Sequence, residues 1–226
     1  RDEHEVVIEN ENIQELVLTD LPDIVGISVN VDSLPRALEI AVEYKHKGIP
    51  VVLGGILPTM APEVIPDDSV DVICIGAAEG TWRDIIKDLQ SGSLKKVYRC
   101  SHQLSGKDIV SPAYDLIPQS NYLYSNILHT SRGCPFRCDF CYNSSPERWY
   151  VCRPIKDVIK EVKRCNRGHV MFIDDNFVGN PKWTREFLPE LKTLGIKWNA
   201  AVSINVVDIP GMLDLMKECG CQGLFI

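Results

Sequence analysis

The chain has 226 residues, of which 45% are hydrophobic and 24% charged, and its formal net charge is −7 at pH 7. This composition is typical of a globular protein with one large or two modest domains. The acidic balance leaves no basic footprint and argues against nucleic acid as a partner, and no apolar run approaches the ~20 residues of a membrane span.

Cysteine usage points to a reducing compartment. The nine cysteines are an odd number, and the charged start at Arg1–Glu5 is no secretory signal, so a disulfide scaffold is not expected. We therefore predict a cytoplasmic location, in which a tight cysteine cluster would bind metal. Because the chain begins with Arg1 and ends on an apolar run, we also expect it to be a piece of a longer protein, cut at both ends.

The first domain is predicted over residues 1–95, with its N-terminus incomplete. Pro35 and Gly48 bound a helix that Ser33 would cap, and apolar positions at helical spacing predict a second helix over residues 82–89. Strands that alternate with helices predict a parallel sheet covered on both faces, in a Rossmann-like (flavodoxin-like) α/β domain. The expected strands are residues 5–8, 24–29, 50–53 and 70–75.

Residues 96–125 lose this rhythm and are predicted to be a linker, with a short edge strand near residues 95–99. A second alternating series fills residues 126–226. It predicts the first half of a (β/α) barrel, incomplete at its C-terminus. Pro189 lies inside an expected helix over residues 181–194, where it should kink or break the helix. The strands of this series are expected at residues 126–130, 170–173, 197–202 and 223–226, and its other helices after Pro154 and over residues 212–219.

Polar residues follow three successive strands of this second series. Reactive groups of (β/α) barrels gather in the loops after the strands, so we expect these loops to meet at one mouth. The residues concerned are Arg132-Gly133-Cys134, then Asp174-Asp175-Asn176, then Ser203 and Asn205.

Cys134, Cys138 and Cys141 lie within eight residues of one another. Thiolates are soft ligands that suit iron–sulfur clusters or zinc. Three ligands on a four-iron cluster would leave one iron open to a cosubstrate. A structural zinc site is the alternative, with His129 or Cys152 as its fourth ligand, but zinc sites more often use two close cysteine pairs. The spacing therefore favours an iron–sulfur cluster.

The Cys-x3-Cys-x2-Cys arrangement, with Phe140 just before the last cysteine, resembles the signature of the radical S-adenosylmethionine (radical SAM) superfamily. Residues 51–55, 75–82 and 172–177 are similar to the branch that carries an N-terminal cobalamin-binding domain, and the resemblance extends over nearly the whole chain. It implies an α/β enzyme made of a cobalamin-binding-like domain followed by a truncated radical SAM partial barrel.

The resemblance also implies roles for individual residues. Cys134, Cys138 and Cys141 would bind three irons of a 4Fe–4S cluster, and the open iron would bind S-adenosylmethionine, whose reductive cleavage gives a 5′-deoxyadenosyl radical. Further residues would contact the cosubstrate: Phe140 the adenine, Asp174 or Asp175 the methionine amino group, and Ser203 and Asn205 the ribose. Ser28, Gly54 and Gly55 occupy positions that resemble those lining the nucleotide tail of cobalamin, although no Asp-x-His-x-x-Gly motif is present.

The function implied is cobalamin-linked methylation, as by a methyltransferase, or ring formation on a small-molecule substrate. Electrons would come from a donor such as flavodoxin or ferredoxin. No residue is assigned as a catalytic acid or base, and the chain by itself is expected to turn over slowly or not at all. The competing hypothesis is a zinc-stabilised binding module without enzymatic activity.

Overall fold

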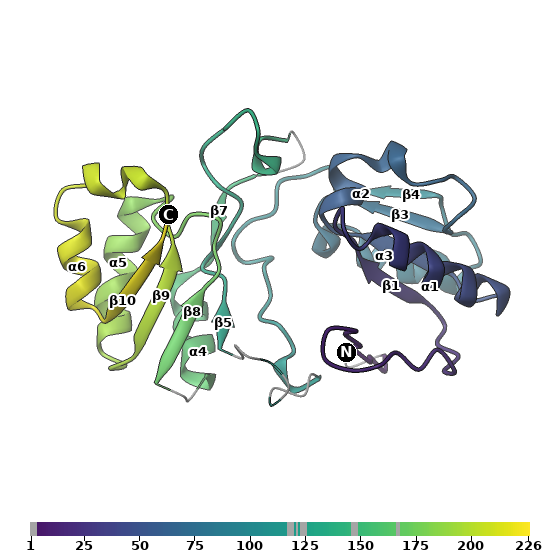
Figure 1. Cartoon of the computed structure of the whole chain (residues 1–226), viewed down its shortest axis with the longest axis horizontal. Helices are drawn as coiled ribbons and strands as arrows, with labels where there is room; N and C mark the ends of the chain where they lie inside the picture. The colour runs from purple at the N-terminus through teal and green to yellow at the C-terminus, as the bar shows by residue number, and fades with distance from the viewer. Residues whose placement is uncertain (1–3, 117–119, 121, 123–125, 146–148, 166–167) are drawn as a thin grey trace. The chain divides into compact units, whose positions relative to one another are not determined.

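The structure is a computed structural model that describes residues 4–116, 120, 122, 126–145, 149–165 and 168–226. Residues 117–119, 121 and 123–125 of the predicted linker lie outside this described part. The chain divides into two compact units (Figure 1). The N-terminal unit comprises Leu16–Leu104 and Cys138–Arg148, and the C-terminal unit comprises Arg1–Glu15, Ser105–Arg137 and Trp149–Ile226.

The N-terminal unit is built on a parallel sheet of four strands in the order β1-β2-β3-β4. This confirms the parallel α/β character that the apolar runs predict. The strand β4, which lies beyond residue 95, is the edge strand of this sheet. The elements are β1 (Val25–Ser28), α1 (Leu34–His46), β2 (Val51–Gly54), α2 (Ile56–Met60), η1 (Pro62–Val64), β3 (Val72–Ile75), η2 (Ala78–Gly80), α3 (Trp82–Gln90) and β4 (Val97–Arg99).

Both faces of this sheet are covered. Because successive side chains of a strand point to opposite faces, Val51 and Leu53 of β2 pack in one apolar cluster with Ala37 and Ala41 of α1. Val52, between them in the sequence, packs in a second cluster that contains Ile85 of α3. Every residue of β3 is buried, as expected for a central strand between two helical layers.

Two local predictions for this half of the chain are wrong. Residues 5–8 form no strand, and Val7 is 72% exposed, because no apolar surface covers these side chains. Ser33 occupies the N-cap position of α1, but its hydroxyl makes no capping hydrogen bond. It instead accepts a hydrogen bond from the N–H of Asn30, at 3.0 Å, and so closes a turn before the helix.

The C-terminal unit contains a second parallel sheet, in the order β10-β9-β8-β5, which follows the chain strand by strand (Figure 1). β6 and β7 form a separate short antiparallel ribbon. The elements of the C-terminal unit are η3 (Tyr114–Leu116), β5 (Ile127–Leu128), β6 (Ser131–Arg132), β7 (Val151–Cys152), α4 (Ile155–Arg164), β8 (His169–Phe172), α5 (Pro181–Lys192), β9 (Lys197–Ala201), η6 (Ile204–Asp208), α6 (Met212–Glu218) and β10 (Cys221–Phe225), and η5 (Tyr142–Ser144) lies in the segment grouped with the other unit.

An aromatic cluster fills the core between this sheet and its helices. The ring centroids of Phe172 and Trp198 are 5.8 Å apart, and Phe177 lies 5.0 Å from each of them. Phe187 of α5 meets Phe172 edge to face at 5.8 Å. Because Phe177 belongs to the loop after β8, its buried ring anchors that loop to the core, directly after the polar residues 174–176.

The helix α5 runs through Pro189, so of the predicted kink or break the break does not occur. A proline inside a helix removes the hydrogen bond to the carbonyl four residues earlier. Here Pro189 and Arg185 are both exposed, so water can hydrate the carbonyl that loses its partner. The position on the solvent face therefore explains why the helix continues.

The start of α5 offers a local test of this fold. The side-chain oxygen of Asn180 accepts a hydrogen bond from the N–H of Trp183, at 3.2 Å, and so caps the helix. Replacing Asn180 with alanine should lower the free energy of unfolding by about 1 kcal/mol, measured by urea denaturation. The Asn180→Asp variant keeps an acceptor and should stay near wild type; equal midpoints for all three proteins would contradict the assignment.

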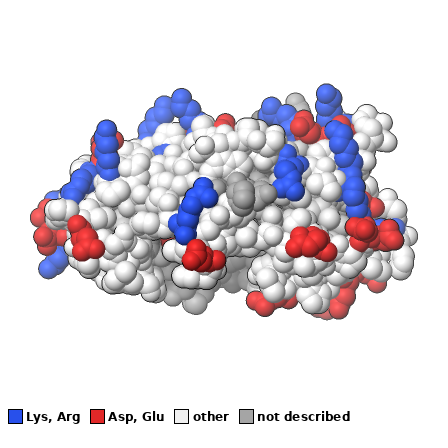
Figure 2. All heavy atoms as spheres, turned by 90° about the horizontal axis from the view of Figure 1, so that it is seen from above, with Lys and Arg blue, Asp and Glu red and all other residues white. Residues whose placement is uncertain are grey.

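Among the described residues, no helix combines the length and apolar character that crossing a bilayer requires. Figure 2 shows one face of the molecule, on which Lys and Arg side chains are interspersed with Asp and Glu side chains. Such mixing of the two signs is ordinary for the surface of a globular domain.

Candidate functional site

The cysteine loop, residues 133–150, begins and ends in one antiparallel ribbon. Ser131 of β6 pairs with Cys152 of β7, and Arg132 pairs with Val151. One step further from the loop, the N–H of Arg153 donates to the carbonyl of Thr130 at 2.9 Å. The two ends of the loop are therefore tied together at its base, immediately after β5.

Gly133 lets the chain turn from the ribbon into the loop. Its φ is +77°, in the left-handed region, and a Cβ there would lie 2.3 Å from the carbonyl oxygen of Trp149. Only glycine tolerates both that dihedral and that close approach. The first cysteine, Cys134, thus follows a position at which the backbone leaves no room for a side chain.

None of the three cysteines of the motif is held in a disulfide in the described part of the chain. Cys138 is exposed, while Cys134 and Cys141 are half-buried, and the N–H of Cys141 donates to the carbonyl of Cys138 at 2.9 Å. Among the described residues, no three His, Cys, Asp or Glu side chains converge as a metal site.

Asp174 joins the loop after β8 to the base of the cysteine loop. It is 2% exposed, and its carboxylate accepts hydrogen bonds from the N–H and hydroxyl groups of Thr130 and Ser131. The hydroxyl of Thr130 lies 2.8 Å from Oδ1, and that of Ser131 lies 2.6 Å from it. Burial raises the pKa of the Asp174 carboxyl, and the hydrogen bonds from Ser131 and Thr130 oppose that shift.

The loops after β8 and β9 are also joined. The side-chain oxygen of Asn176, which is 2% exposed, accepts a hydrogen bond from the N–H of Ser203 at 3.2 Å. The N–H of Phe177 donates to the carbonyl of Ala201 at 2.9 Å. Together with Asp174, these contacts bring the ends of β5, β8 and β9 to one edge of the sheet, where reactive groups of (β/α) domains gather.

Comparison with known proteins identifies this part of the chain, because residues 128–226 match the profile of the radical SAM superfamily. Residues 128–226 are a radical SAM domain. The donor set fits the iron–sulfur cluster that this family implies, since one loop supplies three cysteines and soft thiolates suit such clusters. The matched residues start at Leu128, at the end of β5, and so include the whole cysteine loop.

Curated relatives include methyltransferases and a cyclase. An uncharacterized methyltransferase of Pyrococcus horikoshii is 28% identical over 264 residues, which cover 100% of this chain and 57% of the relative. Bacteriochlorophyllide d C-12(1)-methyltransferase of Chlorobaculum tepidum is 28% identical over 211 residues, covering 88% and 46%. Anaerobic magnesium-protoporphyrin IX monomethyl ester cyclase of Rubrivivax gelatinosus is 27% identical over 251 residues, covering 94% and 45%. This radical SAM chain thus spans about half the length of these relatives.

Asp175, Ser203 and Asn205, which are also predicted to contact the cosubstrate, lie at or near this edge of the sheet. Asp175 is exposed, next to the buried Asp174, and Asn205 is also exposed. Ser203 is half-buried, and its hydroxyl donates to the side-chain oxygen of Asn205. Phe140, on the cysteine loop, is 93% exposed. Contacts of these residues with S-adenosylmethionine stay predictions.

The three residues predicted to line a cobalamin tail come together in the N-terminal unit. Ser28 pairs with Gly54 in the register of β1 and β2. Gly55 has a φ of +101°, and a Cβ there would lie 2.9 Å from backbone atoms of Val29 and 3.0 Å from the hydroxyl of Ser28. The strand ends therefore approach each other closely, and the role of this place in binding stays a prediction.

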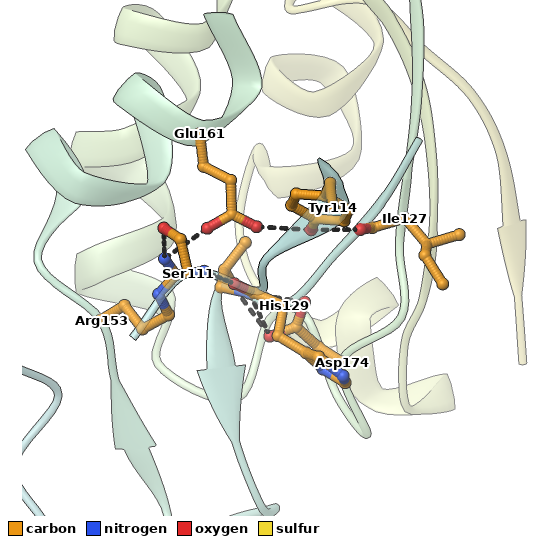
Figure 3. Close-up of polar contacts among 8 residues, drawn as sticks. Ser111, Tyr114, Ile127, His129, Arg153, Glu161 and Asp174 are labelled. Atoms are coloured by element: carbon orange, nitrogen blue, oxygen red, sulfur yellow. Dashed lines mark hydrogen bonds and ion pairs between the residues drawn. The ribbon is translucent and has the colours of Figure 1, made fainter. Parts of the chain in front are cut away.

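Sequence reasoning missed a buried ion pair behind the site (Figure 3). Arg153 and Glu161 are 2% and 1% exposed, and a guanidinium nitrogen of Arg153 lies 2.6 Å from the carboxylate of Glu161. Arg153 also donates to the carbonyl of His129 at 2.7 Å. The hydroxyl of Tyr114 lies within 2.7 Å of Glu161 and 2.9 Å of the carbonyl of Ile127. One signal was available, because Glu161 stands between the apolar positions 158 and 162 of α4.

This network changes the chemistry of Tyr114. Burial raises the pKa of its hydroxyl, and the neighbouring carboxylate of Glu161 raises it further. Tyr114 is therefore a neutral hydrogen-bonding group at physiological pH. Tyr114 links η3 to both β5 and α4. Its contact with Ile127 fixes the start of β5, while the contacts of Thr130 fix the chain just after the end of β5.

The cysteines of the whole chain should differ sharply in reactivity. The thiolate is the form that reacts with iodoacetamide, and burial raises the pKa of Cys74, so less thiolate forms there at a given pH. We expect Cys138, which is exposed, to be alkylated before Cys74, which is 3% exposed. Peptide mass spectrometry of metal-free protein at pH 8 measures the order. Equal rates in folded protein would contradict the placement of these two residues.

Proposed function

We propose that this protein reductively cleaves S-adenosylmethionine at a 4Fe–4S cluster held by Cys134, Cys138 and Cys141. The radical chemistry that follows would serve cobalamin-linked methylation or ring formation on a small-molecule substrate. Residues 126–226 would form the first half of the radical SAM partial barrel. Residues 1–95 would form the Rossmann-like cobalamin-binding domain, with residues 96–125 as the linker.

One observation carries this proposal: three cysteines stand on a single loop near the start of a domain matching the radical SAM superfamily. When bound, the cluster would supply one electron to the cosubstrate. The protein's own residues would bind, orient and shield the reactants. The relatives are named as methyltransferases and as a cyclase. These names agree with both reaction types and do not choose between them.

Each predicted residue has a physical task in this proposal. The exposed carboxylate of Asp175 suits the ammonium of the methionine moiety as a charge-assisted partner. The hydroxyl of Ser203 and the amide of Asn205 suit the ribose hydroxyls. Phe140 offers a flat apolar face to the adenine ring. An external donor such as flavodoxin or ferredoxin would deliver the electron.

Anaerobic reconstitution with iron and sulfide tests the proposal. We expect brown protein with about four irons per chain, an electron paramagnetic resonance signal after reduction that changes on adding S-adenosylmethionine, and 5′-deoxyadenosine as a product. The matched control is the protein in which all three motif cysteines are replaced with alanine. A wild-type chain that takes up no iron beyond that control would refute the proposal.

The zinc-stabilised binding module is the alternative, and the radical SAM match does not favour it. A closed zinc site needs a fourth ligand. This alternative predicts colourless protein that holds one zinc in air. Metal analysis of protein purified without added metal separates the two outcomes.

The cobalamin component needs its own experiment. We expect protein incubated with hydroxocobalamin to retain the corrinoid through gel filtration, and its absorption spectrum would report the amount bound. The close approach of β1 and β2 at Gly55 supports a backbone-lined site at these strand ends. Loss of all corrinoid on the column would remove cobalamin from the proposal and leave S-adenosylmethionine cleavage to stand by itself.

A further inference from the structure

The two adjacent aspartates after β8 have opposite surroundings. Asp174 is 2% exposed and sits beneath the base of the cysteine loop, while Asp175 is exposed. Sequence reasoning treats them as equal candidates for the amino group of S-adenosylmethionine. Their environments in the structure separate them.

The carboxylate of Asp174 is engaged by the protein and closed to solvent. The N–H and hydroxyl groups of Thr130 and Ser131 all donate to Oδ1, and the N–H of Thr130 also lies 3.0 Å from Oδ2. An ammonium could reach Asp174 only if buried groups moved aside, since Asp174 is 2%, Thr130 1% and Ser131 3% exposed.

The residues that Asp174 holds lead straight to the first cysteine. Ser131 begins β6, and only Arg132 and Gly133 separate it from Cys134. Asp174 itself is fixed from both sides, because β8 ends at Phe172 and the ring of Phe177 is buried in the core. The contact therefore transmits the position of the sheet to the backbone that carries Cys134.

A second anchor acts on the same stretch of chain. Arg153 donates to the carbonyl of His129 through its guanidinium and to the carbonyl of Thr130 through its N–H. Asp174 thus holds the donors of Thr130 and Ser131, and Arg153 holds the carbonyls of His129 and Thr130. Figure 3 shows Arg153 and Asp174 beside His129.

From this geometry we propose that Asp174 is a positioning residue for the cluster ligand Cys134, and that Asp175 is the aspartate that contacts the amino group of the cosubstrate. This inference rests on the proposed function. Some residues do not bind the metal themselves but orient the residues that do. Replacing such a residue lowers metal affinity by about 10- to 100-fold. Asp174 should accordingly govern retention of the cluster, and Asp175 should govern binding of S-adenosylmethionine.

The test compares Asp174→Asn and Asp175→Asn, each reconstituted anaerobically, with Asp214→Asn on the exposed surface of α6 as the matched control. An asparagine at position 174 keeps the size of the side chain, removes the negative charge that the donors of Thr130 and Ser131 share, and puts an amide donor in place of Oδ2, 3.0 Å from the N–H of Thr130. We expect this variant to lose iron to a chelator about 10-fold faster than wild type. The Asp175→Asn variant should lose iron at the wild-type rate and bind S-adenosylmethionine at least about 10-fold more weakly.

A second variant guards against simple misfolding. Thr130→Val with Ser131→Ala removes the two hydroxyl donors and keeps the carboxylate and both N–H bonds. It should also release iron faster than wild type and, like the Asp174→Asn variant, alter the resonance spectrum of the reduced cluster. Circular dichroism of the metal-free proteins verifies that each is folded before reconstitution.

The outcomes separate this inference from the proposed function. The positioning role would be overturned if the wild-type protein took up iron and two variants released it at the wild-type rate. These variants are Asp174→Asn and the double variant Thr130→Val with Ser131→Ala. Weaker cosubstrate binding in the Asp174→Asn variant alone, at normal iron release, would exchange the two roles and also overturn it. Failure of the wild-type chain to bind iron would instead refute the proposed function.

Discussion

Replacing Cys141 with alanine should reduce the iron retained after anaerobic reconstitution from about four per chain to below one. The same loss is expected for Cys134 and Cys138, because a cluster with one open iron has only three protein thiolates and no spare ligand. Colorimetric iron analysis and the absorption near 400 nm both measure the effect.

The control for this prediction is a cysteine that lies outside the motif. Cys221 is half-buried in β10, and its sulfur lies 3.7 Å from the carbonyl of Gly223. The Cys221→Ala variant should retain wild-type iron. If the Cys141 variant kept its iron while the control lost it, the motif would not be the ligand set.

Local sequence patterns predicted much of the fold. Apolar periodicity located α3 and the parallel strands of both sheets, because burial alternates along the chain in step with helix and strand geometry. The same reasoning failed for residues 5–8, where apolar side chains have no surface to pack on. The break considered at Pro189 does not occur either, and a sequence does not show that the affected carbonyl faces water.

The site was only partly predictable, for a different reason. The cysteine spacing and the polar residues after each strand are local features, and they identified the loops correctly as places after β5, β8 and β9. The partners of those residues are not local. Asp174 is 44 residues from Thr130, and Tyr114 is 47 residues from Glu161. Such pairings depend on how the sheet assembles, so the sequence could not distinguish Asp174 from Asp175.

The buried ion pair behind the site should have a large effect on stability. Replacing Glu161 with leucine leaves the guanidinium of Arg153 buried at 2% exposure and without its carboxylate. Removing one partner of a buried pair costs about 3–5 kcal/mol. We expect the free energy of unfolding to fall by that amount in urea titrations. Tryptophan fluorescence reports the transition, because Trp183 and Trp198 both lie in this unit.

A double variant distinguishes an ion pair from simple packing. Arg153→Met combined with Glu161→Leu removes the stranded charge, so it should be more stable than Glu161→Leu alone. Recovery should stay incomplete, because the carbonyl of His129 also loses the hydrogen bond from Arg153. That residual cost falls on the residue before Thr130, at the base of the cysteine loop. The double variant should therefore release iron faster than wild type even where its fold is largely recovered. A double variant less stable than Glu161→Leu would contradict the view that an unpaired buried charge dominates the cost.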